Sequence, residues 1–303
     1  MKRFILKVFK FIFPIFLIAL FMEVLLRQSP NDYKFKKEYL DSHSNEIETL
    51  VLGSSHSFYG IDPIYFSNKT FNASHISQSL DIDFELLKKY QANWENLNTV
   101  ILPISYFTFF ENLSNSTEDW RIKNYLIYYN MKIPAPWIYN TEVLSNDFKL
   151  NVERLFSYYI KGNSNITCSN LGWGIEYKSD RGKDLNKTGK AAAIRHTIRN
   201  FKYFEDNKIT IKKIIEFCNN RNINIILFMP PSFITYYENL NAKQLKITVE
   251  TSEKLAKKYE NCQFVNLLNN SKFKANDFYD GDHLNEIGSK KLSLIINEKI
   301  KNK

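Results

Sequence analysis

The sequence predicts an α/β fold in which helices cover both faces of a parallel sheet, preceded by one transmembrane helix. Short apolar, β-rich runs alternate with amphipathic helical segments through most of the chain, which is the pattern of a parallel sheet. A second apolar run, flanked by basic residues, lies at the N-terminus. With 303 residues, of which 44% are hydrophobic, the chain can also build one large core.

The N-terminal run indicates an uncleaved signal anchor. Basic residues precede an apolar stretch over 11–22, which continues over 24–26 past Glu23 and ends at Arg27. A spanning helix needs ~17–25 residues, and no Ala-x-Ala cleavage pattern follows the run. By the positive-inside rule the N-terminus is cytoplasmic. We therefore expect a single-pass protein of the cell membrane whose main domain is extracytoplasmic.

The periodicity predicts elements in a regular order after the anchor. In chain order they are strands at 49–52 and 70–72, a helix over 82–94, a strand at 99–102, a helix over 209–220, a strand at 223–229, a helix over 242–259, a strand at 263–267 and a last helix over 285–300. In a parallel sheet, ligands bind at the carboxyl ends of the strands. Chemistry is therefore expected in the loops that follow them.

Three regions are predicted along the chain. Residues 1–27 form the cytoplasmic tip and the anchor, 28–47 form a polar stalk, and 48–303 form the α/β domain. Within that domain, the less regular, aromatic-rich stretch at about 107–204 reads as an insertion, which could form a helical cap over the site.

Composition and cysteine spacing exclude several classes of protein. The net charge is +9, but the lysines are spread along the chain and no zinc-finger, RNP or basic-helix pattern occurs, so no nucleic-acid partner is expected. Cys168, Cys218 and Cys262 show no CxxC spacing, and one pair could form a disulfide in an oxidising compartment. There is no metal-ligand spacing, P-loop or GxGxxG motif, so neither a metal nor a cofactor is expected.

Two segments carry side chains suited to nucleophilic catalysis. The turn Gly53-Ser54-Ser55-His56-Ser57 directly follows the first strand, and Asp280-Gly281-Asp282-His283 precedes the last helix. A histidine that activates a serine needs an acceptor on its other ring nitrogen, and Asp280 can be that acceptor for His283. Taken singly, each motif has a structural alternative, because Ser54 or Ser55 could cap a helix and the Asp-rich turn could be a surface loop.

The pair of segments resembles the GDSL/SGNH hydrolases. In that family the nucleophile lies in a GDS motif after the first strand, which Gly53-Ser54-Ser55 matches with a serine in the middle, and a DxxH motif precedes the last helix, which Asp280 and His283 match. Together with the anchor, the motifs resemble the membrane-anchored branch that includes the D-alanyl-lipoteichoic acid protein DltD and the alginate O-acetylation proteins. The resemblance spans about 48–106 and 205–300.

This resemblance implies a flavodoxin-like three-layer fold of the SGNH type and a set of site residues. Ser55, Asp280 and His283 would be catalytic. The oxyanion hole would use the backbone N–H groups of Ser55 and Ser77, where a glycine is expected in place of Ser77. The sequence lacks the family's asparagine after the strand at 99–102, and Ser105 would replace it as a weaker donor.

Two further residues are candidates for binding substrate. His56 follows the nucleophile and could line the pocket, and Trp173 lies between glycines and could stack on a sugar ring. For each residue a structural role, with the side chain packed in the core, is the alternative.

The function expected from the sequence is an esterase or O-acyltransferase acting outside the cytoplasm on acyl, foremost acetyl, esters of a cell-surface polysaccharide. The resemblance implies a cell-surface glycan or other acylated polymer as substrate and a membrane-bound acyltransferase as a candidate partner. The alternative is a catalytically weak or inactive SGNH-fold component of a cell-envelope assembly that binds a glycan or a partner protein.

Overall fold

The computed structural model describes residues 1–301 and contains one sheet of five parallel strands. The strands are β1 (Thr49–Val51), β2 (Thr70–Asn72), β3 (Thr99–Pro103), β4 (Asn224–Met229) and β5 (Cys262–Asn266), in the spatial order β2-β1-β3-β4-β5. This is the strand order of flavodoxin-like folds. The α/β class, the parallel sheet and the apolar N-terminal helix predicted from the sequence are confirmed.

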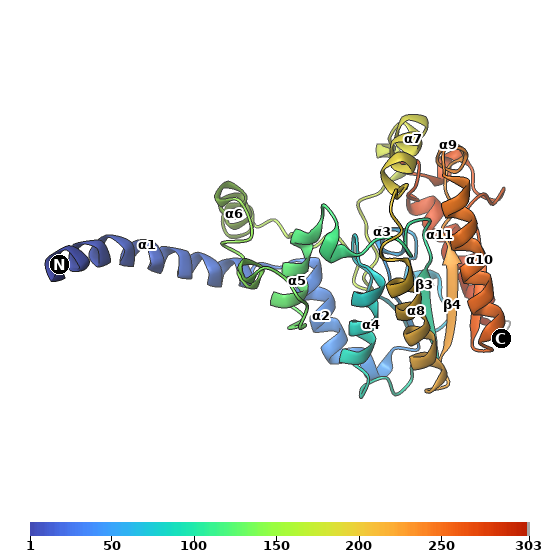
Figure 1. Cartoon of the computed structure of the whole chain (residues 1–303), viewed down its shortest axis with the longest axis horizontal. Coiled ribbons are helices and arrows are strands. Elements are labelled where there is room, and N and C mark those ends of the chain that lie inside the picture. Colours follow the sequence, from blue (N-terminus) through green and yellow to red (C-terminus); the bar gives the residue numbers. More distant parts are fainter. Residues whose placement is uncertain (302–303) are drawn as a thin grey trace. The chain divides into compact units, whose positions relative to one another are not determined.

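Helices connect the strands and continue into the N-terminal region (Figure 1). They are α1 (Lys2–Gln28), α2 (Asp32–His43), α3 (Ser55–Phe58), α4 (Leu80–Lys89), α5 (Ile122–Ile127), α6 (Phe148–Leu155), α7 (Leu185–His196), α8 (Phe204–Asn219), α9 (Ile234–Glu238), α10 (Ala242–Lys258) and α11 (Glu286–Lys301). The stretch 28–47, predicted as a stalk, contains the helix α2. Helix α1 is long and apolar enough to be a membrane anchor or a signal sequence.

The chain forms two compact units. One contains residues 1–37 and 117–166, and the other contains 38–116 and the chain from residue 167 onward. The stretch 107–204, expected as one insertion, is therefore divided between them. The sheet and all the predicted site residues belong to the second unit.

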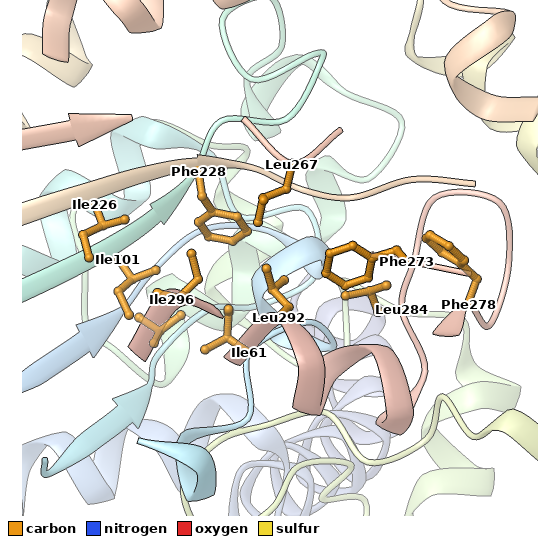
Figure 2. Packing of buried hydrophobic residues seen from close by; sticks show 11 residues of the cluster. Ile61, Ile101, Ile226, Phe228, Leu267, Phe273, Phe278, Leu284, Leu292 and Ile296 are labelled. Carbon is orange, nitrogen blue, oxygen red and sulfur yellow. The ribbon is translucent and has the colours of Figure 1, made fainter. Parts of the chain in front are cut away.

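Helix α11 packs on the sheet and fixes the loop that precedes it. Leu292 and Ile296 on this helix are fully buried in one apolar cluster with Ile226 and Phe228 of β4, and Leu284 in the preceding loop joins them (Figure 2). Full burial of one such side chain contributes about 1.5–3 kcal/mol. The loop before α11 is therefore anchored on the core and not left to solvent.

The turn after β1 depends on glycine. Gly53 has φ +101°, a conformation that L side chains rarely adopt, and a Cβ there would lie 2.3 Å from Cδ and Cγ of Pro103 at the end of β3. The glycine lets the chain pass close to β3 and enter α3 at once, with Ser54 as its N-cap and Ser55 as its first residue.

The three cysteines, Cys168, Cys218 and Cys262, are buried and form no disulfide within residues 1–301.

Candidate active site

Ser55, His283 and Asp280 lie in hydrogen-bonding contact, although they come from opposite ends of the chain. The Oγ atom of Ser55 is 2.9 Å from Nε2 of His283, and Nδ1 of His283 is 3.0 Å from Oδ1 of Asp280. The same Asp280 oxygen accepts the backbone N–H groups of His283 (2.9 Å) and Asp282 (3.2 Å), which fixes the carboxylate. This order of donor and acceptor atoms is that of a Ser-His-Asp relay; its catalytic role stays a prediction.

The loop that carries Asp280 and His283 is closed on itself. The backbone N–H of Tyr279 donates to the carbonyl of His283 (3.0 Å), and the side chain of Asn285 donates to the carbonyls of Asn276 (2.9 Å) and Phe278 (3.2 Å). These bonds join both ends of the loop just before α11. The sheet core and the loop together therefore hold the His283 ring toward Ser55.

A second carboxylate, Asp282, lies near the same ring nitrogen of His283 as Asp280. Its Oδ1 is 3.6 Å from Nδ1 of His283, while its Oδ2 lies 3.7 Å from Nε2 of His56, 3.9 Å from Nδ1 of His196 and 3.9 Å from Nη2 of Arg195. Its side chain is 2% exposed, and within residues 1–301 its Oδ2 accepts no hydrogen bond. Two carboxylates thus lie near Nδ1 of His283, that of Asp280 in direct hydrogen-bond contact and that of Asp282 close by.

Burial and the two carboxylates give the three histidines different pKa values. Burial alone would lower the pKa of His283, but the charges of Asp282 and Asp280 raise it to about 9. Burial lowers the pKa of His56, and it lowers that of His196 to about 3. Burial would raise the pKa of Asp282, but the charge of His283 and the neighbouring imidazoles hold it below its ordinary value. The site therefore favours a His283 imidazolium beside an ionised Asp282, with His56 and His196 neutral.

Two of the predicted oxyanion residues, Ser77 and Ser105, have different surroundings in the structure. Ser77 has φ +60°, so the position expected to be a glycine has the left-handed backbone that glycine adopts most readily. Ser105 is buried, its Oγ lies 2.7 Å from Nδ1 of His56, and its N–H donates to Oγ1 of Thr108 (2.9 Å). The Ser105 hydroxyl is therefore already hydrogen-bonded to His56. The His56 ring in turn lies next to that of His283, with the ring centroids 5.0 Å apart.

Asp83 is a site residue that the sequence reasoning missed. Its Oδ1 accepts the backbone N–H of Gly53 (2.8 Å) and the side-chain N–H of Gln78 (2.6 Å), so it joins the turn that carries Ser55 to the loop that carries Ser77. Burial raises the pKa of Asp83 to about 7. Asp83 lies among the apolar residues on the buried face of α4, and this pattern could have identified it from the sequence, because a buried carboxyl needs hydrogen-bonding partners.

Aromatic side chains flank His283 at the edge of the site. The ring of Tyr177 is stacked between those of Tyr59 (centroids 3.6 Å apart) and Tyr279 (3.8 Å apart), and its edge meets the His283 ring at 5.5 Å. These tyrosines form an apolar wall beside the relay. Because they are far apart in the sequence, only the fold brings them together.

Trp173 is packed beneath this wall and does not present a free face to a sugar. Its side chain is 8% exposed, its indole N–H donates to the carbonyl of Tyr59 (2.8 Å), and Lys178 lies over its ring at 5.0 Å. This placement agrees with the core-packing alternative for Trp173, and contact of its ring with a sugar stays a prediction.

His56, Asp282 and His283 also form a cluster of metal-ligand types whose ligand atoms lie within 4.8 Å of one another. Both ring nitrogens of His283 already contact Ser55 and Asp280, so a metal bound there would have to displace one of these contacts. A cavity of about 10 Å³ lies next to Asp282 and His56, also lined by Ser105. That volume is about that of one water molecule.

Known proteins offer little beyond this geometry. No protein-family model and no curated protein matches the chain. Among solved structures, the chain is similar to a protein of Streptococcus pneumoniae described as a candidate platelet activating factor, at 12% sequence identity and a TM-score of 0.43. The match covers 95% of this chain and 97% of the other. A function for this chain therefore has to follow from the site itself.

Proposed function

We propose that the chain is a membrane-anchored serine ester hydrolase or O-acyltransferase that acts outside the cytoplasm on acyl, foremost acetyl, esters of a cell-surface polysaccharide. The observation that carries this proposal is the continuous contact from Ser55 Oγ through the His283 ring to Asp280, in a loop that is anchored on the core. The alternative role of Ser55 as a helix cap is not supported, because the N-cap of α3 is Ser54 and its side chain makes no capping bond.

In the proposed reaction, neutral His283 takes the proton of Ser55 Oγ through Nε2 as the oxygen attacks the ester carbonyl. The resulting oxyanion would be stabilised by backbone N–H groups, with those of Ser55 and Ser77 as the candidates. When the tetrahedral intermediate collapses, the bond to the alcohol breaks and His283 returns the proton to it. Water or a glycan hydroxyl then attacks the acyl-enzyme, again giving its proton to His283. Collapse of this second tetrahedral intermediate breaks the bond between the acyl group and Ser55 Oγ, and His283 returns the proton to Oγ.

Transfer to a glycan is the finer part of the proposal. The buried relay and the wall of Tyr59, Tyr177 and Tyr279 reduce the space for water beside His283, as transfer to a hydroxyl acceptor requires. The apolar helix α1 is long enough to keep the chain at the membrane, close to surface polymers.

A fluorophosphonate probe tests the relay directly. The intact protein should be labelled covalently at Ser55, and labelling should vanish in Ser55→Ala and fall by at least a hundredfold in His283→Ala. Ser54→Ala is the matched control, since the neighbouring hydroxyl makes no capping bond, and it should be labelled like the unmodified protein. Peptide mass spectrometry locates the label, and full labelling of Ser55→Ala would disprove the assignment.

The second candidate function is a binding component without turnover. The observation in its favour is the Ser105 hydroxyl, which is committed to His56 at the position where the resemblance expects an asparagine donor. Loss of one oxyanion donor typically costs about 10²–10³ in rate. A folded protein, shown by its circular dichroism, that takes no label at any pH from 6 to 10 would favour this candidate. Mass spectrometry of surface glycans from cells that lack the protein would then identify the polymer concerned.

A further inference from the structure

The helical segment 148–160 presents an uncovered apolar face. Helix α6 continues into a π-helical turn at Phe156–Ile160. Phe148, Val152 and Phe156 are spaced four residues apart and so lie on one face; they are 69%, 43% and 49% exposed. Tyr159 extends this stripe and is 42% exposed. Four large apolar side chains in one row are unusual on a surface that meets only water.

The opposite face of the segment is fixed to its own unit by polar contacts. The side chain of Asn151 donates to the carbonyl of Val143 (3.1 Å) and is buried. Arg154 donates to the carboxylate of Glu142 (2.7 Å), which also accepts from the buried Lys123 (2.6 Å). The apolar stripe is therefore held outward by a rigid support.

The same unit contains α1, and the segment is attached to the end of α1 where the apolar run stops. The hydroxyl of Tyr159 donates to the carbonyl of Leu25 (3.0 Å). The Glu23 carboxylate accepts the backbone N–H groups of Glu142 (3.0 Å) and Val143 (2.9 Å). In a spanning helix, residues at the end of the apolar run lie where hydrocarbon gives way to water. Residues 142–160 are therefore held at that level.

The direction and flanks of the segment agree with this position. In Figure 1, α6 is seen nearly end-on next to α1, which runs across the picture, so the two axes cross. Further exposed apolar side chains lie in the stretch before α6, with Trp137 71% and Leu144 54% exposed. Lys149 and Glu153 lie beside the stripe and are exposed. An apolar stripe with a charged border is the pattern of a helix that lies in the plane of a membrane surface.

We propose that the segment 148–160 is a second membrane contact, an in-plane helix whose stripe of Phe148, Val152, Phe156 and Tyr159 is covered by lipid. The stripe enters the boundary between headgroups and acyl chains while α1 crosses the bilayer. Lipid is the occupant because the hydrogen bonds to Glu23 and Leu25 place the stripe at the interface of the bilayer that α1 spans. This inference rests on the proposed membrane anchoring by α1, but it does not depend on the chemistry of Ser55.

Fluorescence of the full chain in lipid vesicles tests the contact. Val152→Cys and Glu153→Cys form a matched pair, because the two residues are adjacent and exposed but point about 100° apart around the helix. Each variant, labelled with an environment-sensitive dye, is placed in vesicles of phosphatidylcholine and phosphatidylglycerol, with and without a doxyl-labelled lipid. The native cysteines are buried, and the unmodified protein carried through the same labelling gives the background.

The dye at position 152 should show a blue-shifted emission and at least threefold stronger quenching by the doxyl lipid than the dye at 153. Phe148→Cys should behave like Val152→Cys. If positions 148 and 152 emit as in water and are not quenched, lipid does not cover the stripe, and a protein partner or a second copy of the chain would be its occupant. Equal quenching at 152 and 153 would also overturn the in-plane orientation.

Discussion

Replacement of Asp282 by asparagine should move the pH dependence of the proposed reaction by several units. Asp282 Oδ1 is 3.6 Å from His283 Nδ1 and the pair is buried, so the carboxylate charge acts on the imidazole with little screening. At an effective dielectric constant of about 20, two unit charges at this distance interact by about 4.5 kcal/mol, or roughly three pKa units. Asparagine keeps the shape of the side chain and removes the charge.

The sign of the effect follows from which form of His283 reacts. With its pKa at about 9, His283 is mostly protonated at neutral pH, and only the neutral ring can accept the Ser55 proton. The rate of labelling of the unmodified protein should therefore rise with pH to a plateau above about 9. In Asp282→Asn, Asp280 remains as the one neighbouring carboxylate, and Arg195, whose charge lowers the pKa of His283, is no longer opposed by Asp282. The plateau should then begin two to three units lower.

The assay is the rate of Ser55 modification by an activated acetyl ester or a fluorophosphonate, measured from pH 5 to 11. Glu286→Gln is a control, because this partly exposed carboxylate at the start of α11 accepts a hydrogen bond from Ser179 and is not among the charges that act on His283. It should leave the midpoint unchanged. If the midpoint of Asp282→Asn stays within half a unit of that of the unmodified protein, Asp282 does not control the charge of His283 and this account of the site is wrong.

Two further predictions concern the stability of each unit. Gly53→Ala should lower the free energy of unfolding by at least about 2 kcal/mol, because a strained φ and a steric clash occur together. Gly162→Ala, where φ is positive but no atom lies within 4 Å, should lower it by only about 1 kcal/mol. Urea unfolding of the two variants measures the difference. Glu142→Gln should lower the free energy of unfolding by about 3–5 kcal/mol, because it leaves the buried Lys123 and the partly buried Arg154 without their carboxylate partner. Glu153→Gln, at an exposed ion pair, should lower it by less than about 0.5 kcal/mol. Hydrogen exchange in residues 117–166 measures both. Burial would raise the pKa of Glu142, but its cationic partners hold it at about 2, so its contribution to stability persists above about pH 4.5 and is lost as the pH falls toward 2.

The sheet and its helices could be predicted from the sequence because local signals determine them. Each buried strand is a short apolar run that ends in a turn or a proline, as at Gly53 and Pro103, and each covering helix has the matching apolar period. The elements differ from the prediction mainly at their ends, where capping and fraying decide the boundary. The stretch 28–47 differs more, because its polar composition hid the helix α2.

The relay could be placed from the sequence because topology brings the carboxyl ends of parallel strands to one edge. Its surroundings could not, because they depend on contacts between segments that share no sequence signal. His196 reaches Asp282 from the irregular stretch 107–204, and Tyr177 reaches His283 from the same stretch. A lone histidine or tyrosine in such a stretch gives no indication of its neighbours.

These surroundings indicate which of the two transition-state charges the proposed enzyme stabilises more strongly. When Ser55 attacks, a positive charge forms on His283 and a negative charge forms on the substrate oxygen. Around the negative charge on the substrate oxygen, the expected asparagine is absent and the hydroxyl of Ser105 is hydrogen-bonded to His56. If no other donor replaces it, the transition state loses about 2.7–4 kcal/mol of stabilisation. Around the positive charge on His283 there are two carboxylates, although the relay needs only one. The second, Asp282, stabilises the imidazolium by a few kcal/mol at 3.6 Å. Above about pH 9, where His283 is neutral before the reaction, a strong preference for the imidazolium can therefore offset a weak oxyanion hole, because the two charges form in the same step. At neutral pH the ring already carries its charge, so the second carboxylate stabilises the resting protein as well and gives no such offset.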